Sequence, residues 1–291
     1  KDATNLLLSL WDGHLYATNT SGVSSEIDPL ITFDADAKMR GVLLRESFYF
    51  GNGVDFMAKS DGTTVTQWDF VTAVTFNSSV LTGTGTDTLY GYTVTAVTEN
   101  GESEMATERT VFGPRTLSTT NKITNTWDRK TDSSVRGYNI YKAVNGGTLN
   151  LLTFVDQQAS GATMSYVDDG TETTSLLYEA PTFNTTGGVK GNLFGKYANT
   201  LFVSGNVQEP DAVFYGGTGA LFESFSPDAN GGWIKPGRGD GERVTGMIGF
   251  ESFLFIFKEN SIWRFEFGGD GSPTLIAVIP QYGTSSPDTI S

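Results

Sequence analysis

Few residues of this chain have the types and spacing that catalysis requires. His14 is the only histidine and cysteine is absent, which excludes multi-histidine metal sites, thiolate catalysis and Cys-based zinc or iron sites. A Ser-His-Asp triad could form only once, and no Gly-x-Ser-x-Gly turn supports one. Because His14 lies in "WDGHLY", a turn followed by a strand, we expect it to have a structural role.

Two pairs of carboxylates are the remaining candidates for acid–base chemistry or metal binding. They are Asp34 with Asp36 in "FDADAKM", and Asp168 with Asp169 in "YVDDGTE". Such pairs could bind calcium, or hydrolyse a glycosidic bond if the carboxylates faced each other about 5–9 Å apart. Nothing in the sequence fixes that geometry, and Asp is a common turn residue. We therefore expect solvated turn acids, and we predict no catalytic residue, metal site or cofactor.

The segment "IKPGRGDGERVTGM" contains Arg238 to Asp240, the tripeptide by which some extracellular proteins are bound by animal cell-adhesion receptors. Gly237, Gly239 and Gly241 alternate with polar residues here, and glycine adopts positive φ without steric cost. The same residues are therefore typical of a tight turn. We predict a turn and no adhesion function.

Two other motifs are also better explained by turns than by a functional site. "KSDGTTVTQW", which ends at Trp68, resembles the aspartate-box turn of sialidase-like propellers but lacks the residue that should separate Asp61 from Gly62. "GGDGSP" has no Gly-Lys-Ser or Gly-Lys-Thr and no following helix, so nucleotide binding has no support. A turn and a tryptophan at a sheet edge are sufficient to explain the first motif.

Composition indicates an all-β globular protein. The 291 residues include 35 glycines and 12% aromatics, and a hydrophobic content of 38% is enough to bury a core. No stretch of ten or more residues has a convincing apolar period of 3.6, which argues against amphipathic helices. Stability must come from packing, since disulfides are absent.

Charge and hydropathy restrict the partners. With 19 basic and 33 acidic residues the net charge is −14, which gives no attraction to nucleic acid or to anionic membranes. An acidic surface would still suit a passage through which DNA slides, because like charge prevents adhesion to phosphates. No apolar run approaches the length of a membrane span, so we predict no membrane insertion. The chain starts at Lys1 without the layout of a signal peptide, and its first apolar run predicts a strand already under way, as in a segment of a longer polypeptide.

Residues 1–70 and 183–291 share one pattern of short strands separated by Gly, Asn and Asp turns. Four segments align: "LLLSLWDGHLYATN", "VLLRESFYFGNG", "LFGKYANTLFVSGN" and "MIGFESFLFIFKEN". Each reads as a strand, a tight turn and a second apolar strand, a degenerate repeat that predicts blades of a β-propeller, with a jelly roll or stacked sandwich as the alternative. In 253–267 we predict a hairpin anchored in the core by Phe255 and Trp263, with both faces of 253–257 covered.

The middle stretch, 71–182, differs in character. "DTLYGYTVTAVTENGESEMATERTV" predicts a strand with Tyr92, Val94 and Ala96 on one face, followed by a turn at 100–101. In the following strands Trp127 is a core candidate, and Tyr138 shares a face with residue 140. These pieces resemble a fibronectin type III module, although the "YTVTAVTENGES" strand comes first instead of last. We therefore expect an inserted β-sandwich with a permuted strand order.

Blade-like strands interrupted by this module, together with "EPDAVFYGG", "GRGDGERVTGM", "FKENSIWRF" and the closing "SSPDTIS", resemble the propeller-bearing structural proteins of tailed-bacteriophage tails and necks. The resemblance implies a non-enzymatic virion protein, in the tail or neck, that contacts other virion proteins and forms a homo-oligomeric ring. It does not specify a host receptor. The alternative, from a different functional class, is a secreted carbohydrate-binding or carbohydrate-active propeller.

Overall fold

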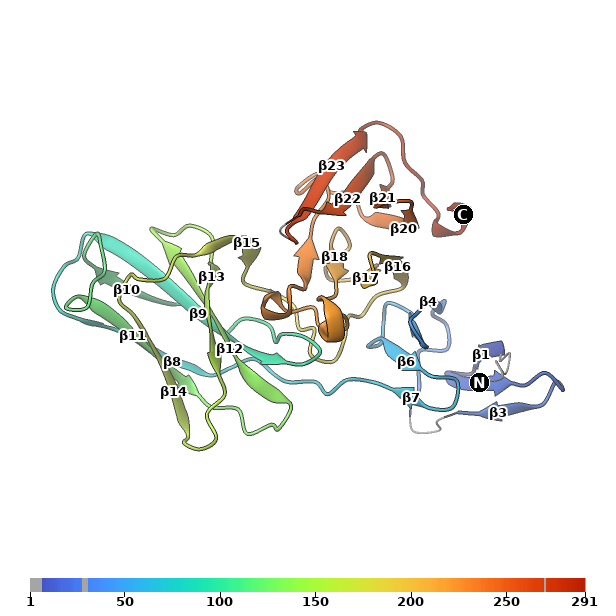
Figure 1. Cartoon of the computed structure of the whole chain (residues 1–291), viewed down its shortest axis with the longest axis horizontal. Coiled ribbons are helices and arrows are strands. Elements are labelled where there is room, and N and C mark those ends of the chain that lie inside the picture. Colours follow the sequence, from blue (N-terminus) through green and yellow to red (C-terminus); the bar gives the residue numbers. More distant parts are fainter. Residues whose placement is uncertain (1–6, 28–30, 270, 291) are drawn as a thin grey trace. The chain divides into compact units, whose positions relative to one another are not determined.

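The computed structural model describes residues 7–27, 31–269 and 271–290, and these residues form an all-β protein, as composition predicts (Figure 1). The helical elements among them are three short 3-10 turns, η1 (Gly219–Leu221), η2 (Pro227–Ala229) and η3 (Pro287–Thr289). The chain divides into two compact units. The first comprises Lys1–Trp68, Gly187–Glu223 and Asn230–Ser291, and the second Asp69–Thr186 and Ser224–Ala229. For comparison, the predicted insertion is 71–182, without the separate segment 224–229.

The first unit contains four antiparallel sheets, in each of which the strands follow one another in chain order. The first sheet consists of β1 (Leu7–Trp11), β2 (His14–Thr18) and β3 (Ser24–Glu26). The second consists of β4 (Arg40–Leu44), β5 (Ser47–Gly51), β6 (Ala58–Ser60) and β7 (Val65–Thr66). The third consists of β16 (Leu193–Tyr197), β17 (Thr200–Ser204), β18 (Val213–Tyr215) and β19 (Gly232–Ile234). The fourth consists of β20 (Val244–Phe250), β21 (Phe253–Lys258), β22 (Ile262–Phe267) and β23 (Pro273–Ile279).

Each of these sheets starts with a hairpin whose turn has two residues. The first turn residue has a positive φ in all four, at Asp12 (50°), Arg45 (54°), Ala198 (48°) and Glu251 (51°). Positive φ at this place matches the twist of the turn to that of the flanking strands, which fixes the register. The four segments that align in the sequence are therefore the first hairpins of four separate sheets.

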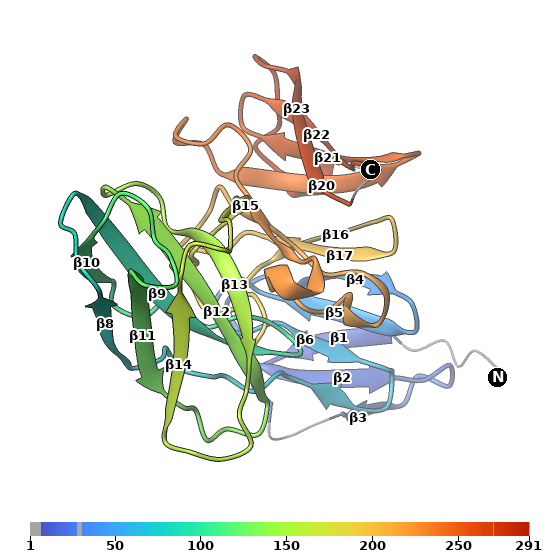
Figure 2. The ribbon, with the colours of Figure 1, turned by 60° about the vertical axis from the view of Figure 1, so that its left-hand side comes forward.

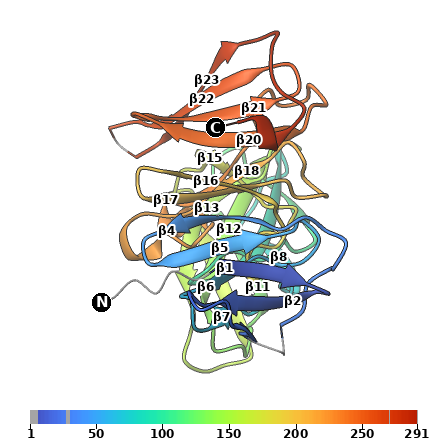
Figure 3. The same ribbon diagram turned by 90° about the vertical axis from the view of Figure 1, so that its right-hand side faces the viewer.

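The sheets of the first unit pack face to face in chain order (Figure 3). The first strand of the third sheet, β16, lies beside both β4 and β20. Aromatic side chains fill the space between the third and fourth sheets, where Phe202 and Tyr215 meet Phe265. Leu15 of the first sheet and Phe50 of the second belong to another buried cluster. None of the four sheets closes on itself.

The second unit contains two antiparallel sheets (Figure 2). The three-stranded sheet has the order β14–β11–β8, formed by Thr163–Asp168, Lys122–Asp128 and Phe76–Thr82. The five-stranded sheet has the order β10–β9–β12–β13–β15, formed by Arg109–Gly113, Thr88–Thr98, Val135–Val144, Asn150–Asp156 and Ser175–Glu179. Both sheets contribute side chains to one hydrophobic core.

The core of the second unit confirms the predicted faces. Trp127 is fully buried, with its ring edge-on to Tyr138 at 5.4 Å between centroids. Tyr92, Val94 and Ala96 of β9 point into the same core. The opposite face of the five-stranded sheet is buried too, but it is polar: Thr95 and other hydroxyl and amide side chains occupy it. No periodicity in the sequence indicates this second, polar interior.

Candidate functional site

The turn that contains the adhesion-like tripeptide has the backbone that its glycines predict. Gly237, Gly239 and Gly241 have φ of 61°, 86° and 76°, and the amide of Asp240 donates to the carbonyl of Gly237 at 3.0 Å. These φ values are strained for any residue with a Cβ. The turn prediction is thereby confirmed for the backbone.

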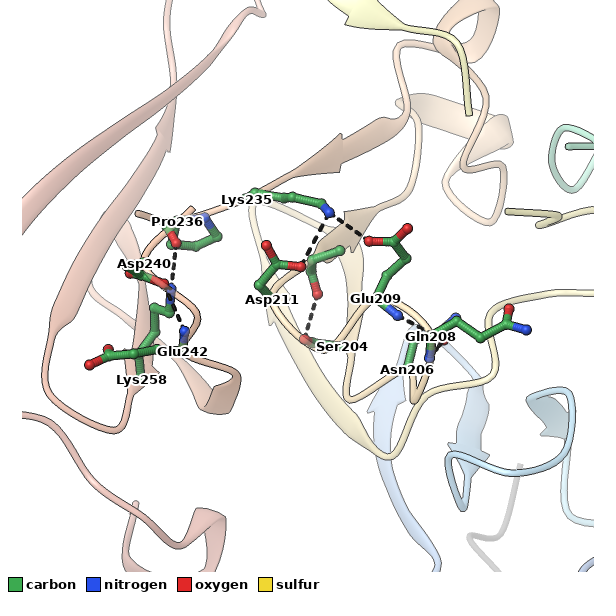
Figure 4. A network of polar contacts seen from close by, with 11 residues as sticks. Ser204, Asn206, Gln208, Glu209, Asp211, Lys235, Pro236, Asp240, Glu242 and Lys258 are labelled. Carbon is green, nitrogen blue, oxygen red and sulfur yellow. Dashed lines mark hydrogen bonds and ion pairs between the residues drawn. The ribbon is translucent and has the colours of Figure 1, made fainter. Parts of the chain in front are cut away.

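The carboxylate of Asp240 is bound inside the molecule (Figure 4). Lys258, whose side chain is completely buried, places its Nζ 2.6 Å from both Asp240 oxygens and 2.7 Å from the carbonyl oxygen of Pro236. A buried ammonium is stable only if it is paired and hydrogen-bonded, and the turn provides both. Asp240 is thus an internal counter-ion, and the tripeptide has a structural explanation.

A second lysine is neutralised nearby on the same unit (Figure 4). Lys235 Nζ lies 2.5 Å from Glu209 Oε2 and 3.3 Å from Asp211 Oδ1. Burial disfavours its charge, but the two carboxylates outweigh burial and raise the pKa of Lys235. This contact ties the loop after β17 to the residue that follows β19. Within that loop, the carbonyl of Ala212 accepts a hydrogen bond at 2.6 Å from Ser204, the last residue of β17.

The carboxylates of Asp168 and Asp169 do not act together. Contrary to the expectation of a solvated turn acid, Asp168 is fully buried: it lies 2.6 Å from Lys142 Nζ and accepts a hydrogen bond from the Tyr92 hydroxyl at 2.7 Å. Burial, and then the negative charge of Asp168, raise the pKa of Tyr92. Asp169 is partly exposed and accepts hydrogen bonds from the amide and hydroxyl of Thr171. The sequence could not indicate this burial, because the partners come from β9 and β12.

The first acidic pair fits the expectation of turn residues. Asp34 accepts from the amide of Asp36 at 2.9 Å, and its own amide donates to Asp55 at 2.6 Å. Asp61 likewise accepts from the amides of Thr64 and Thr63, which lower its pKa. These carboxylates satisfy backbone donors in turns. Within the described ranges no group of three or more His, Asp or Glu side chains is placed to hold a metal ion.

His14 has a partner that the sequence does not indicate. Its Nδ1 lies 2.6 Å from Glu26 Oε1, across the β2–β3 pair, with both side chains about one-third exposed. Trp68, at the end of the aspartate-box-like segment, lies with its ring 5.5 Å from Lys59 Nζ. In the described part of the chain, no helix is both long and apolar enough to cross a bilayer.

A buried acid that sequence reasoning missed lies on the polar face of the five-stranded sheet. One oxygen of Glu102 accepts from the hydroxyls of Thr95 and Tyr141 and from the amide of Asn139. All three donors are uncharged, and burial raises the pKa of Glu102 despite these hydrogen bonds. In the sequence, "ENGESE" reads as a solvated turn. The backbone of Glu102 also exchanges hydrogen bonds with Thr185.

The fourth sheet has one fully packed face, whereas its other face is only partly covered, with Pro287 and Ile290 lying over Gly246. The prediction that both faces of 253–257 are covered therefore holds in full for one face only. Leu254, Ile256 and Phe265 are fully buried against the third sheet. Successive side chains of a strand point to opposite faces, so Phe255 points away from the third sheet. Phe255 pairs with Arg264 on that side, whereas Ile256 pairs with Trp263 on the packed side. Phe255 as a core anchor is therefore wrong, and Trp263 packs at the edge of the core, partly buried.

We call the second side of this sheet the outer face. Its apolar members are partly or largely exposed, with Phe250 at 60% and Ile276 at 41%. Arg264 covers part of it by stacking its guanidinium 4.4 Å above the Phe253 ring. The register of the four strands assigns to the outer face Ile248, Phe250, Phe253, Phe255, Phe257, Ile262 and Ile276. An apolar surface of this kind is typical of a contact with another protein layer.

A cleft of about 420 Å³ opens where three sheets of the first unit begin. Arg40 starts β4, Leu193 starts β16, and Arg243 directly precedes β20. The loop after β17 and residues 285 and 287 complete the lining. The cleft thus brings together residues that are far apart in the sequence, and it is the candidate site for a small ligand.

No protein-family model matches this chain, and no curated protein sequence matches it.

Proposed function

We propose that this protein is a non-enzymatic structural component of a tailed-bacteriophage virion, in the tail or neck, and that it acts by assembling with other subunits. Its four small sheets are then propeller-like blades, and the second unit is a fibronectin type III-like module inserted between the second and third blades. The sequential order of the strands and the stacking of the sheets through β4, β16 and β20 support the blade assignment.

The strand order of the second unit supports the module assignment. In immunoglobulin-like sandwiches the last two strands pair beside the third, giving the order G–F–C in one sheet. Here β10–β9–β12 has that order, with β9 and β10 placed early in the chain. This arrangement fits the permutation expected from the position of the "YTVTAVTENGES" strand.

The observation that carries the assembly proposal is the outer face of the fourth sheet. On its other side, the same sheet buries a layer of aromatic residues against the third sheet. A blade in a propeller is covered on both sides, whereas the described residues cover the outer face only in part, with Pro287 and Ile290 over Gly246. We infer that a β-sheet of a neighbouring subunit covers it in a homo-oligomeric ring. Burying Phe250 and its neighbours would contribute roughly 25 cal/mol per Å² of apolar surface.

Charge adds a condition on this assembly. Identical subunits with a net charge of −14 repel each other. Salt screens that repulsion and leaves the apolar contact intact, so association should strengthen from low to moderate ionic strength.

Sedimentation velocity of the purified chain tests the proposal. We expect wild type to form a discrete oligomer that grows in population with salt, and Phe250→Arg to sediment as a monomer. Val80→Arg is the matched control, because Val80 is similarly exposed but lies on β8 of the second unit. A wild-type monomer under all these conditions would contradict the assembly. Mass spectrometry of purified phage particles that encode the chain tests the virion location, which requires a stoichiometric amount of this protein.

A further inference from the structure

Thr245, which lines the cleft at the starts of β4, β16 and β20, has a buried hydroxyl without a partner in the described part of the chain. Thr245 is only 3% exposed, and its Oγ1 makes no hydrogen bond among the described residues. An unsatisfied buried hydroxyl is costly, so a polar group facing it from the cleft would be favoured.

Two arginines line the cleft and present hydrogen-bond donors that suit an anion. Arg40 uses one of its nitrogens, Nη2, for long contacts of 3.3 and 3.5 Å with Asp288, which leaves further donors of its guanidinium fork for another acceptor. Arg243 donates through Nε to Glu259 at 3.1 Å, and its side chain is 61% exposed. Guanidinium groups bind carboxylates in a bidentate manner when the geometry allows it.

The chain itself places a carboxylate beside Arg40. Asp288, in η3, also lies 2.7 Å from Lys38 Nζ, and these contacts lower the pKa of Asp288. Asp288 would remain paired with Lys38 if a second carboxylate replaced it as the partner of Arg40. Asp288 therefore shows which chemical group this position accepts, and it would compete with a ligand.

The remaining lining completes a small amphipathic site. Asn192 and Asn206 add amides, and Leu193 and Val207 add apolar surface. A volume of about 420 Å³ is in the range of small-molecule sites, which run from about 300 to 1,000 Å³. The combination suits a compact ligand that has one carboxylate and several hydroxyls.

We propose that this cleft binds a small hydroxylated carboxylate of the acidic-monosaccharide class, with the carboxylate on Arg40 and a hydroxyl on Thr245. The tests of the two proposals are distinguishable, because calorimetry measures ligand binding and sedimentation measures the oligomeric state.

Isothermal titration calorimetry with glucuronate tests the proposal, with glucose, acetate and inorganic phosphate as comparison ligands. We expect glucuronate to bind more tightly than all three. Arg40→Met should weaken its binding about tenfold to a hundredfold, the usual value of a hydrogen bond to a charged group. Arg115→Met, an exposed arginine of the second unit, is the matched control and should leave binding unchanged.

Thr245→Val separates a binding role from a structural one. It should weaken glucuronate binding severalfold while leaving thermal stability equal or higher, because the hydroxyl has no internal partner to lose. Asp288→Asn should strengthen binding by removing the competing carboxylate. Equal binding of acetate, phosphate and glucuronate would overturn the recognition of hydroxyls, and absence of glucuronate binding at millimolar concentration would overturn the proposal as a whole.

Discussion

Replacing Asp240 by Asn tests whether the adhesion-like tripeptide is a structural element. The substitution keeps the size of the side chain but removes the counter-ion of Lys258, whose ammonium is completely buried. Removing one partner of a buried ion pair typically costs about 3–5 kcal/mol of unfolding free energy. Because Asp240 is one-third exposed and water can reach part of the site, we expect about 3 kcal/mol, at the lower end of that range.

The reverse substitution should be milder. Lys258→Met removes the buried charge and leaves Asp240 partly hydrated, so we expect a loss of only about 1–2 kcal/mol. The double variant, Asp240→Asn with Lys258→Met, also lacks the buried ammonium, so the stability of this variant should match that of Lys258→Met. Asp240→Asn should therefore be less stable than Asp240→Asn combined with Lys258→Met, an order that no simple loss of contacts produces.

Urea unfolding of the four proteins at neutral pH measures these differences, and hydrogen exchange at the amides of β20–β22 localises them to the fourth sheet. Glu259→Gln is the matched control. It removes an exposed ion pair with Arg243 on the same sheet and should change the free energy by no more than about 0.5 kcal/mol. An Asp240→Asn protein as stable as wild type would refute the reasoning. An integrin-dependent adhesion signal lost in this variant without a change in stability would restore the adhesion hypothesis.

Two further predictions concern the interiors of the two units. Burial raises the pKa of Glu102 above 4.5, so the folded state binds the proton of this carboxyl more tightly than the unfolded state does. The free energy of unfolding should therefore fall as pH rises from about 4.5 toward the pKa of the folded state. Urea unfolding at several pH values should show this slope in wild type and not in Glu102→Gln. Phe265→Ala should cost about 3–5 kcal/mol, because Phe265 is fully buried among aromatic rings. Phe255→Ala, on the outer face, should cost clearly less in the same denaturant assay, and equal losses would mean that the outer face is covered within the monomer.

Several features of the fold follow from local sequence patterns. Two-residue turns with a positive φ at Asp12, Arg45, Ala198 and Glu251 fix four hairpins, and a strand alternation of period two selects the apolar faces. The sequence also predicts that Trp127 lies in the core and, from the absence of helical periodicity, that the protein is all-β. Such features depend on residues within a few positions of one another, which is why they can be predicted without knowing the fold.

The candidate sites depend on contacts between distant segments, so only the tertiary structure determines which residues are buried or paired there. Asp168 reads as a turn acid until Tyr92, 76 positions earlier, is seen to donate to it. Phe255 and Ile256 are equally apolar in the sequence, but only Ile256 lies on the side of the sheet that packs against the third sheet. The cleft joins Arg40 to Thr245 because three first strands stack side by side. Alternation and turn residues determine how each hairpin forms, whereas burial and charge pairing depend on which sheet packs against which.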